Sequence, residues 1–141
     1  RRGLRQGLTV NGAAQPKIKK ALHDLKQWLP HTEVQTVCDG DLNHKKWLQA
    51  GGRLYLVDWE QVALGDPAYD LADVLAHYGS PATSHQFLDA YGARLDEDLK
   101  RRLYWYGDLH LLHDIKVAAT HQRFEEVAQV LHQFECLQAS R

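Results

Sequence analysis

The sequence predicts an α+β fold in which helices predominate and a single small β-hairpin lies between them. Two apolar runs flank Gly51-Gly52, and a glycine pair between such runs is typical of a tight hairpin turn. After Pro67, apolar residues recur every three or four positions almost to the end of the chain, which is the period of amphipathic helices. With 141 residues, 44% hydrophobic and 25% charged, the chain has the composition of an ordinary globular protein.

The first half of the chain is expected to hold one helix and three short strands. The helix should begin at Pro16, because proline is tolerated in a first turn, and should stop before Pro30. A strand is expected over residues 34–38, and the two hairpin strands over 47–50 and 53–58. Because the last of these strands is apolar on both faces, we expect both of its faces to be covered.

The second half is expected to form four helices. The first should end near Gly79 and Pro81, and the second should be N-capped by Thr83 or Ser84 and closed by Gly92. The stripes of apolar residues place these helices at residues 68–77, 84–91, about 99–115 and 124–137.

Composition and charge exclude several classes of partner. The formal net charge of -1 argues against a nucleic-acid partner, although six Lys/Arg and no acids occur in residues 1–20. We therefore divide the chain into a basic arm or linker, residues 1–14, and one domain, residues 15–141. No apolar run approaches the about 20 residues that span a membrane. Cys38 and Cys136 are isolated thiols, which favours a reducing, cytoplasmic location.

The candidate site consists of carboxylates around the hairpin. Asp41 lies in a polar loop before the hairpin, Asp58 ends its second strand, and Glu60 follows two residues later. The turn between the strands should bring Asp41 and Asp58 together. Two convergent carboxylates suit phosphoryl transfer, where one orients a substrate hydroxyl and the other holds Mg²⁺. The spacing by itself is equally compatible with two loop carboxylates without a chemical role.

Two motifs give the chain a family resemblance. Residues 36–78 resemble the catalytic core of the aminoglycoside phosphotransferase and choline kinase family, whose fold is similar to that of protein kinases. The family pattern His-Gly-Asp-x-x-x-x-Asn corresponds to Asp39-Gly40-Asp41-x-x-x-x-Lys46. The second pattern corresponds to Val57-Asp58-Trp59-Glu60 followed by Gly65-Asp66-Pro67-x-x-Asp70-Leu71-Ala72. The resemblance covers only the C-terminal lobe, so we expect the N-terminal nucleotide-binding lobe to be absent.

The resemblance implies a role for each site residue. Asp41 would be the catalytic base, Asp58 the Mg²⁺ ligand with help from Glu60, and the implied cofactors are Mg²⁺ and ATP. The acceptor would be a small hydroxyl compound that receives the γ-phosphate in the intact enzyme. Supporting roles fall to Asp70, Gly40 and Asp39. Contacts with the substrate or within the loop are implied for Asn43, His44, Lys46 and Trp59.

The absence of a nucleotide-binding lobe and two departures from the pattern predict that this chain is inactive on its own. Lys46 stands in the position of the metal-binding asparagine, and a lysine side chain has no acceptor atom. Its ammonium would also repel a nearby Mg²⁺. Asp39 stands in the position of the histidine and adds an anion there.

The alternative is a non-catalytic binding or assembly module. In it Lys46 would pair with Asp41 or Asp58 in place of a metal, and apolar surface around residues 18–29 and 47–57 would support a homo-oligomer. A weaker alternative is a zinc site on the long helix at His110 and His113, next to Asp114.

Overall fold

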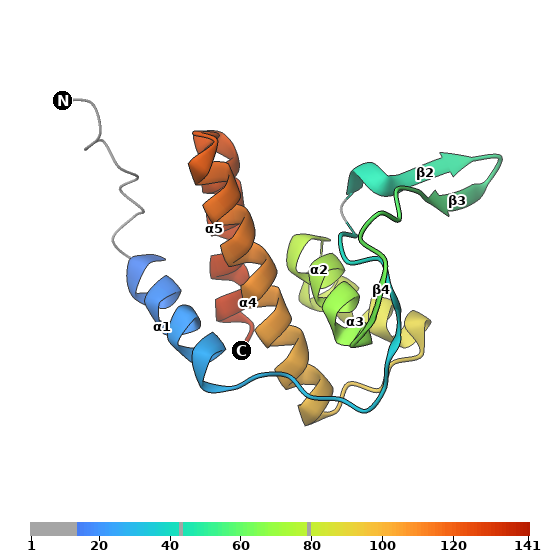
Figure 1. The fold of residues 1–141 in the computed structure, drawn as a ribbon, viewed down its shortest axis with the longest axis horizontal. Helices are drawn as coiled ribbons and strands as arrows, with labels where there is room; N and C mark the ends of the chain where they lie inside the picture. Colours follow the sequence, from blue (N-terminus) through green and yellow to red (C-terminus); the bar gives the residue numbers. More distant parts are fainter. Residues whose placement is uncertain (1–13, 43, 79) are drawn as a thin grey trace. The chain divides into compact units, whose positions relative to one another are not determined.

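The α+β class with dominant helices is confirmed by the computed structural model, which describes residues 14–42, 44–78 and 80–141. Figure 1 shows the elements in order. They are α1 (Ala14–Gln27), β1 (Thr36–Cys38), the 3₁₀ turn η1 (His44–Lys46), β2 (Trp47–Ala50), β3 (Arg53–Leu56), β4 (Ala63–Gly65), α2 (Pro67–Tyr78), α3 (Pro81–Tyr91), α4 (Glu97–Thr120) and α5 (Phe124–Ala139). The chain forms two compact units, described separately below: residues 30–107, and the described part of 1–29 together with 108–141. The proposed division at residue 14 falls at the edge of the described range.

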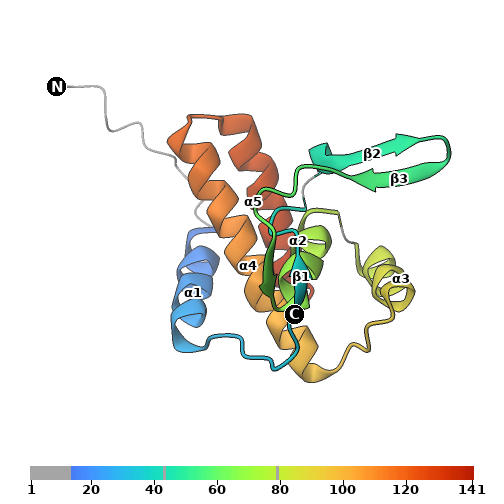
Figure 2. The same cartoon turned by 45° about the vertical axis from the view of Figure 1, so that its right-hand side comes forward.

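The helical unit contains α1, the second part of α4, and α5. The chain reverses between α4 and α5, and both views show these two helices side by side (Figures 1 and 2). Their apolar residues include Leu111, Ala118 and Phe134, each fully buried. Asp108 is also buried, and it accepts a hydrogen bond from Gln138 Nε2 at 2.6 Å.

The mixed unit is built around α2, which packs against β1. Strand β1 is two residues shorter than expected and pairs antiparallel with β4, in a register that places Val37 opposite Leu64. Strand β4 is not predicted by the sequence because its three residues are too few to show an alternating pattern. Buried leucines from α2, α3 and the start of α4 form the core of this unit: Leu71, Leu88, Leu99 and Leu103.

The hairpin is confirmed, but its expected burial is wrong. Strands β2 and β3 pair in a register that runs from Trp47 opposite Leu56 to Ala50 opposite Arg53. Both turn glycines have positive φ, 56° and 73°, as a tight hairpin turn requires. Figure 1 shows the hairpin projecting from the rest of the unit, and Leu54 and Tyr55, on opposite faces, are 62% and 46% exposed.

One helix start also differs from the prediction. The N-cap of α3 is Ser80, not Thr83 or Ser84, because Ser80 and Thr83 form a reciprocal capping box. The backbone N–H of Thr83 donates to Ser80 Oγ at 3.2 Å, and that of Ser80 donates to Thr83 Oγ1 at 2.7 Å. Gly92 closes α3 as expected, with φ 80°.

The starts and ends of the other helices follow the prediction closely. Helix α1 begins at Ala14, two residues before Pro16. Helix α2 ends at Tyr78, and Gly79 lies outside the described residues. Within the described ranges, no helix combines the length and the hydropathy that a membrane crossing needs.

Candidate functional site

The open end of the hairpin brings Lys46 and Asp58 together. Lys46 comes directly before β2, and Asp58 follows β3 by two residues. The backbone N–H of Val57 donates to the carbonyl of Lys46 at 3.0 Å, which extends the strand pairing by one step. Asp58 has a left-handed backbone, φ 67°, a strained conformation for a residue other than glycine. Its carbonyl accepts a hydrogen bond from Lys46 Nζ at 2.8 Å.

The same ammonium contacts the loop that carries Asp41. Lys46 Nζ lies 3.2 Å from Asp39 Oδ1 and 3.5 Å from Asp41 Oδ2. Lys46 Nζ therefore contacts the Asp41 carboxylate and the backbone carbonyl of Asp58, and the convergence of the two carboxylates stays a prediction. The Asp41 side chain is 38% exposed, whereas those of Lys46 and Asp39 are 4% and 1% exposed.

Asp39 is a buried carboxylate with few partners. Its Oδ1 atom accepts from Lys46 and from the backbone N–H of Asp41 at 3.1 Å. Its Oδ2 atom has no hydrogen-bond partner among the residues that the structure describes. A buried anion is costly unless it is paired, so Lys46 is the group that makes this position tolerable.

Two carboxylates of α2 hold the loop on both sides of Asp41. Asp70 accepts from the backbone N–H groups of Asp39, at 2.7 Å, and Gly40, at 3.0 Å. Asp73 accepts from the backbone N–H of Leu42 at 2.9 Å. Burial raises the pKa of Asp70, although the two backbone hydrogen bonds oppose this shift. The loop backbone is thus fixed to a helix at three of its N–H groups.

Gly40 is required by a close approach of two backbones. Its φ is +87°, and a Cβ atom at this position would lie 3.0 Å from the carbonyl oxygen of Gln61. Both facts favour glycine, because it has no side chain and adopts positive φ without strain. The loop can therefore lie against the segment that leads into β4.

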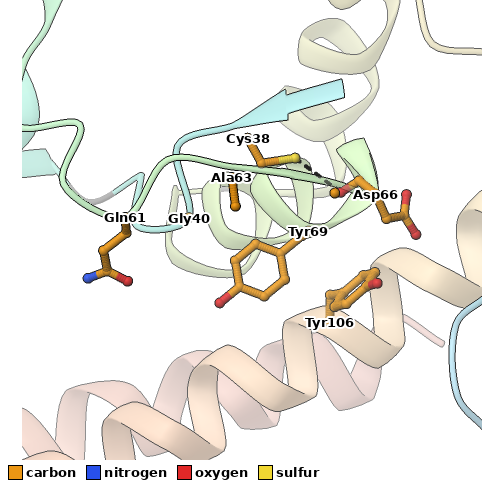
Figure 3. Close-up of a pocket in the computed structure, with 8 residues that line it drawn as sticks. Cys38, Gly40, Gln61, Ala63, Asp66, Tyr69 and Tyr106 are labelled. Carbon is orange, nitrogen blue, oxygen red and sulfur yellow. Dashed lines mark hydrogen bonds between the residues drawn. The ribbon is translucent and has the colours of Figure 1, made fainter. Parts of the chain in front are cut away.

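A pocket of about 310 Å³ lies beside the loop, within the mixed unit. Figure 3 shows Cys38 and Ala63, from β1 and β4, on one side and the rings of Tyr69 and Tyr106 on the other. These two rings meet edge to face, with centroids 5.3 Å apart. Burial and the nearby Asp66 carboxylate raise the pKa of Tyr106 to about 12.

Asp66, at the rim of this pocket, has a structural role. Its Oδ1 atom accepts from the backbone N–H of Ala68 at the start of α2 and pairs with Arg102 of α4. The same guanidinium also pairs with Asp98 at 2.9 Å. Arg102 thus ties the start of α2 to α4 inside this unit.

The remaining predicted site residues lie near the hairpin base. Glu60 is exposed in the turn after Asp58, and Trp59 is 46% exposed with its Nε1 donating to the carbonyl of Leu56. Asn43 and the His44 side chain lie outside the described residues. The roles of Asp58 and Glu60 as metal ligands and of Asp41 as base stay predictions.

The oxygen atoms around Lys46 do not fit a divalent cation. The position among them is taken by the Lys46 ammonium, whose Nζ lies 2.8 to 3.5 Å from each. Lysine itself offers no ligand atom. Over residues 14–42, 44–78 and 80–141, no group of three or more His, Cys, Asp or Glu side chains is arranged to hold a metal, and this includes the histidines of α4.

Sequence reasoning missed two residues that organise the site. Asp73 is three residues after Asp70, a spacing that places both side chains on the same side of a helix, and this spacing could have identified it. Arg102 is 36 residues from Asp66, and no local pattern connects them.

Comparison with known proteins gives the family and the fold. The phosphotransferase enzyme family matches residues 2–106. A thermostable mutant of aminoglycoside phosphotransferase APH(4)-Ia in its apo form shares the fold, with a TM-score of 0.70, 21% identity, and coverage of 93% of this chain and 46% of that one. Spectinomycin phosphotransferase APH(9)-Ia, solved with ADP and spectinomycin, gives a TM-score of 0.66 at 19% identity, with coverage of 91% and 46%. The chain spans less than half the length of these proteins.

Proposed function

The chain belongs to the phosphotransferase enzyme family, and we propose that it carries the acceptor-activating part of an ATP-dependent phosphotransferase site. The observation that carries this proposal is the fixed loop around Asp41. Three neighbouring backbone N–H groups are bound by Asp70 and Asp73, and the Asp41 carboxylate at the centre of the loop remains accessible. Rigid presentation of an accessible carboxylate is what positioning of a reacting hydroxyl needs.

In the proposed reaction the Asp41 carboxylate accepts the hydrogen bond, and then the proton, of the acceptor hydroxyl. The hydroxyl oxygen attacks the γ-phosphorus of ATP, and the bond from this phosphorus to the bridging oxygen breaks to release ADP. ATP as the donor is supported by family neighbours solved with AMP-PNP and with ADP. Positioning of the reactants contributes most of the catalysis in this type of transfer.

The acceptor we propose is a small hydroxyl compound. This is supported by the neighbouring structures, which hold hygromycin B in one protein and spectinomycin in another. We also propose a cytoplasmic location, which the two free thiols, Cys38 and Cys136, favour.

We further propose that the 141-residue chain alone transfers no phosphate. It spans 46% of the first of the neighbouring proteins described above, so about half of that fold has no counterpart in this chain. The test is a transfer assay with γ-labelled ATP and a panel of hydroxyl acceptors. It compares this chain with the complete product of the gene that encodes it.

We expect transfer by the complete product and none by the chain. Asp41→Asn should lower the rate of the complete product about a hundredfold or more, because general-base catalysis contributes about 10²–10⁴-fold. Asp89→Asn, a matched change at an exposed aspartate of α3, should leave the rate unchanged. An Asp41→Asn rate within threefold of the unaltered rate contradicts the role of Asp41, and transfer by the chain alone contradicts its inactivity.

The second candidate function is a non-catalytic binding module that self-associates. It is favoured by the ion pairs of Lys46 and by the exposed apolar side chains of the hairpin, which include Leu48 at 52% and Leu54 at 62%. Light scattering should then show a dimer that Leu54→Gln weakens, whereas Leu95→Gln, at an exposed leucine outside the hairpin, should not. A monomer at all concentrations, or stabilisation of the chain by ATP with Mg²⁺, counts against this candidate.

A further inference from the structure

We propose that the Lys46 ammonium is a permanent internal cation of this site and that it keeps divalent metal ions out of the space between Asp39, Asp41 and the Asp58 carbonyl. The inference concerns the electrostatics of the site and does not depend on whether phosphate is transferred. In this proposal the Lys46 ammonium takes the place of the metal that the family resemblance implies.

The contacts of Lys46 place its ammonium group among three oxygen atoms. Three oxygen atoms, of Asp39, Asp41 and the Asp58 backbone, lie 2.8 to 3.5 Å from Nζ. Two of them, Asp39 Oδ1 and the Asp58 carbonyl, accept hydrogen bonds from Nζ, and Asp41 Oδ2 forms an ion pair with it. The oxygens come from the two chain segments that the open end of the hairpin brings together, and Lys46 therefore links these segments as a bound cation would.

Burial and backbone contacts hold this side chain in place. Only 4% of the Lys46 side chain is exposed, and the backbone carbonyl of the same residue accepts from Val57 at 3.0 Å. A lysine in solution on a flexible stem could swing aside to admit a metal. If Lys46 swung aside, it would leave the Asp39 carboxylate unpaired, and this side chain is only 1% exposed. Its Oδ2 atom already has no hydrogen-bond partner in the described part of the chain.

The surroundings of Lys46 favour its charged form, because two carboxylates and a backbone carbonyl lie around Nζ. A metal ion entering between the same oxygens would therefore meet a positive charge at hydrogen-bond distance from its ligands. It would also find no acceptor atom on the residue at position 46.

Asp39 and Lys46 are thus a matched pair within one loop. The carboxylate stands where the family pattern has a histidine, and the ammonium stands where it has an asparagine. The two side chains are 3.2 Å apart and buried together. Each residue supplies the charge that makes the other tolerable in a buried position.

The test is a titration of the 141-residue chain with Mn²⁺, a spectroscopic substitute for Mg²⁺, followed by the paramagnetic resonance of the free ion. We expect no saturable binding by the unaltered chain up to millimolar Mn²⁺. Lys46→Asn removes the ammonium and provides an amide oxygen, so it should bind Mn²⁺ about tenfold more tightly or better. Lys45→Asn is the matched control, because it makes the same change at the exposed neighbouring lysine and should leave binding unchanged.

The unaltered chain alone can overturn the proposal. Saturable Mn²⁺ binding that is lost in Asp39→Asn or Asp41→Asn shows that a metal enters despite Lys46. Equal affinities of Lys46→Asn and Lys45→Asn overturn it as well. If Lys46→Asn fails to fold, the double variant Asp39→Asn/Lys46→Asn, which removes both buried charges, takes its place. It is also expected to bind Mn²⁺ more tightly than the unaltered chain. Neither ATP nor an acceptor is present, so the outcome is independent of the proposed phosphotransferase activity.

Discussion

Replacement of Lys46 by methionine is expected to destabilise the protein by about 3 kcal/mol. Methionine keeps the length of the side chain and removes its charge, and it leaves the Asp39 carboxylate buried with 1% of its side chain exposed. Breaking a buried ion pair by removing one partner costs about 3–5 kcal/mol. We place the change at the lower end because Asp41, on the same ammonium, is 38% exposed and can be hydrated when Lys46 is absent.

A double-mutant cycle separates the pair from its surroundings. Asp39→Asn alone keeps the shape of the side chain and should cost about 1–2 kcal/mol, because Lys46 retains two acceptors, Asp41 and the Asp58 carbonyl. The variant with both changes leaves no uncompensated buried charge. It should be more stable than the sum of the single changes implies, by a coupling energy of about 1.5 kcal/mol or more.

The assay is equilibrium unfolding in urea at pH 7, followed by circular dichroism. The coupling should persist in high salt, since buried charges are screened little. Lys45→Met, at the exposed neighbour of Lys46, should change stability by no more than about 0.5 kcal/mol. Additivity of the Asp39→Asn and Lys46→Met effects to within about 0.5 kcal/mol would refute the reasoning, because it would show that these two charges do not stabilise each other.

Three further predictions concern the glycine cap, the loop and the buried carboxylate of the helical unit. Gly92→Ala should lower stability in urea unfolding by about 1 kcal/mol, because the cap of α3 has φ 80°; an unchanged midpoint contradicts this account. Asp70→Ala should accelerate amide hydrogen exchange at Asp39 and Gly40 about tenfold or more, since it removes the acceptor of both N–H groups; unchanged protection at both amides would show that other contacts fix the loop. Burial raises the pKa of Asp108, so the folded protein binds this proton more tightly than the unfolded chain does. The stabilisation from Asp108 is full below about pH 4 and is lost as the pH rises through the raised pKa. Urea unfolding over this range should therefore show the unaltered protein losing stability relative to Asp108→Asn, and parallel pH profiles contradict the shift.

Periodicity was sufficient for most of the fold. Helices α4 and α5 have long apolar stripes, and their packing follows from the need to bury them. The glycine pair at 51–52 located the hairpin because few residues adopt two successive positive φ values. Strand β4 was missed because it exists through its pairing with β1, a contact between distant segments that leaves no pattern in three residues.

The cap of α3 shows the limit of single-residue signals. Thr83 and Ser84 both have capping side chains, and so does Ser80. The backbone geometry selects among them, because only the residue with extended backbone before the first turn can accept from the N3 amide. Ser80 has φ -112° and ψ 164°, which is this conformation.

The sequence alone determined the family, the hairpin and the residues that converge at its base, because motifs and periodicity are local properties of a chain. Tertiary structure alone decided what lies at the centre of that convergence. Whether Lys46 points at Asp39, at Asp41 or into solvent depends on the path of the loop over α2 and on the register of the hairpin, which no local pattern encodes. Burial then decides the chemistry, because an ammonium enclosed between two carboxylates and a carbonyl cannot leave without exposing an unpaired charge.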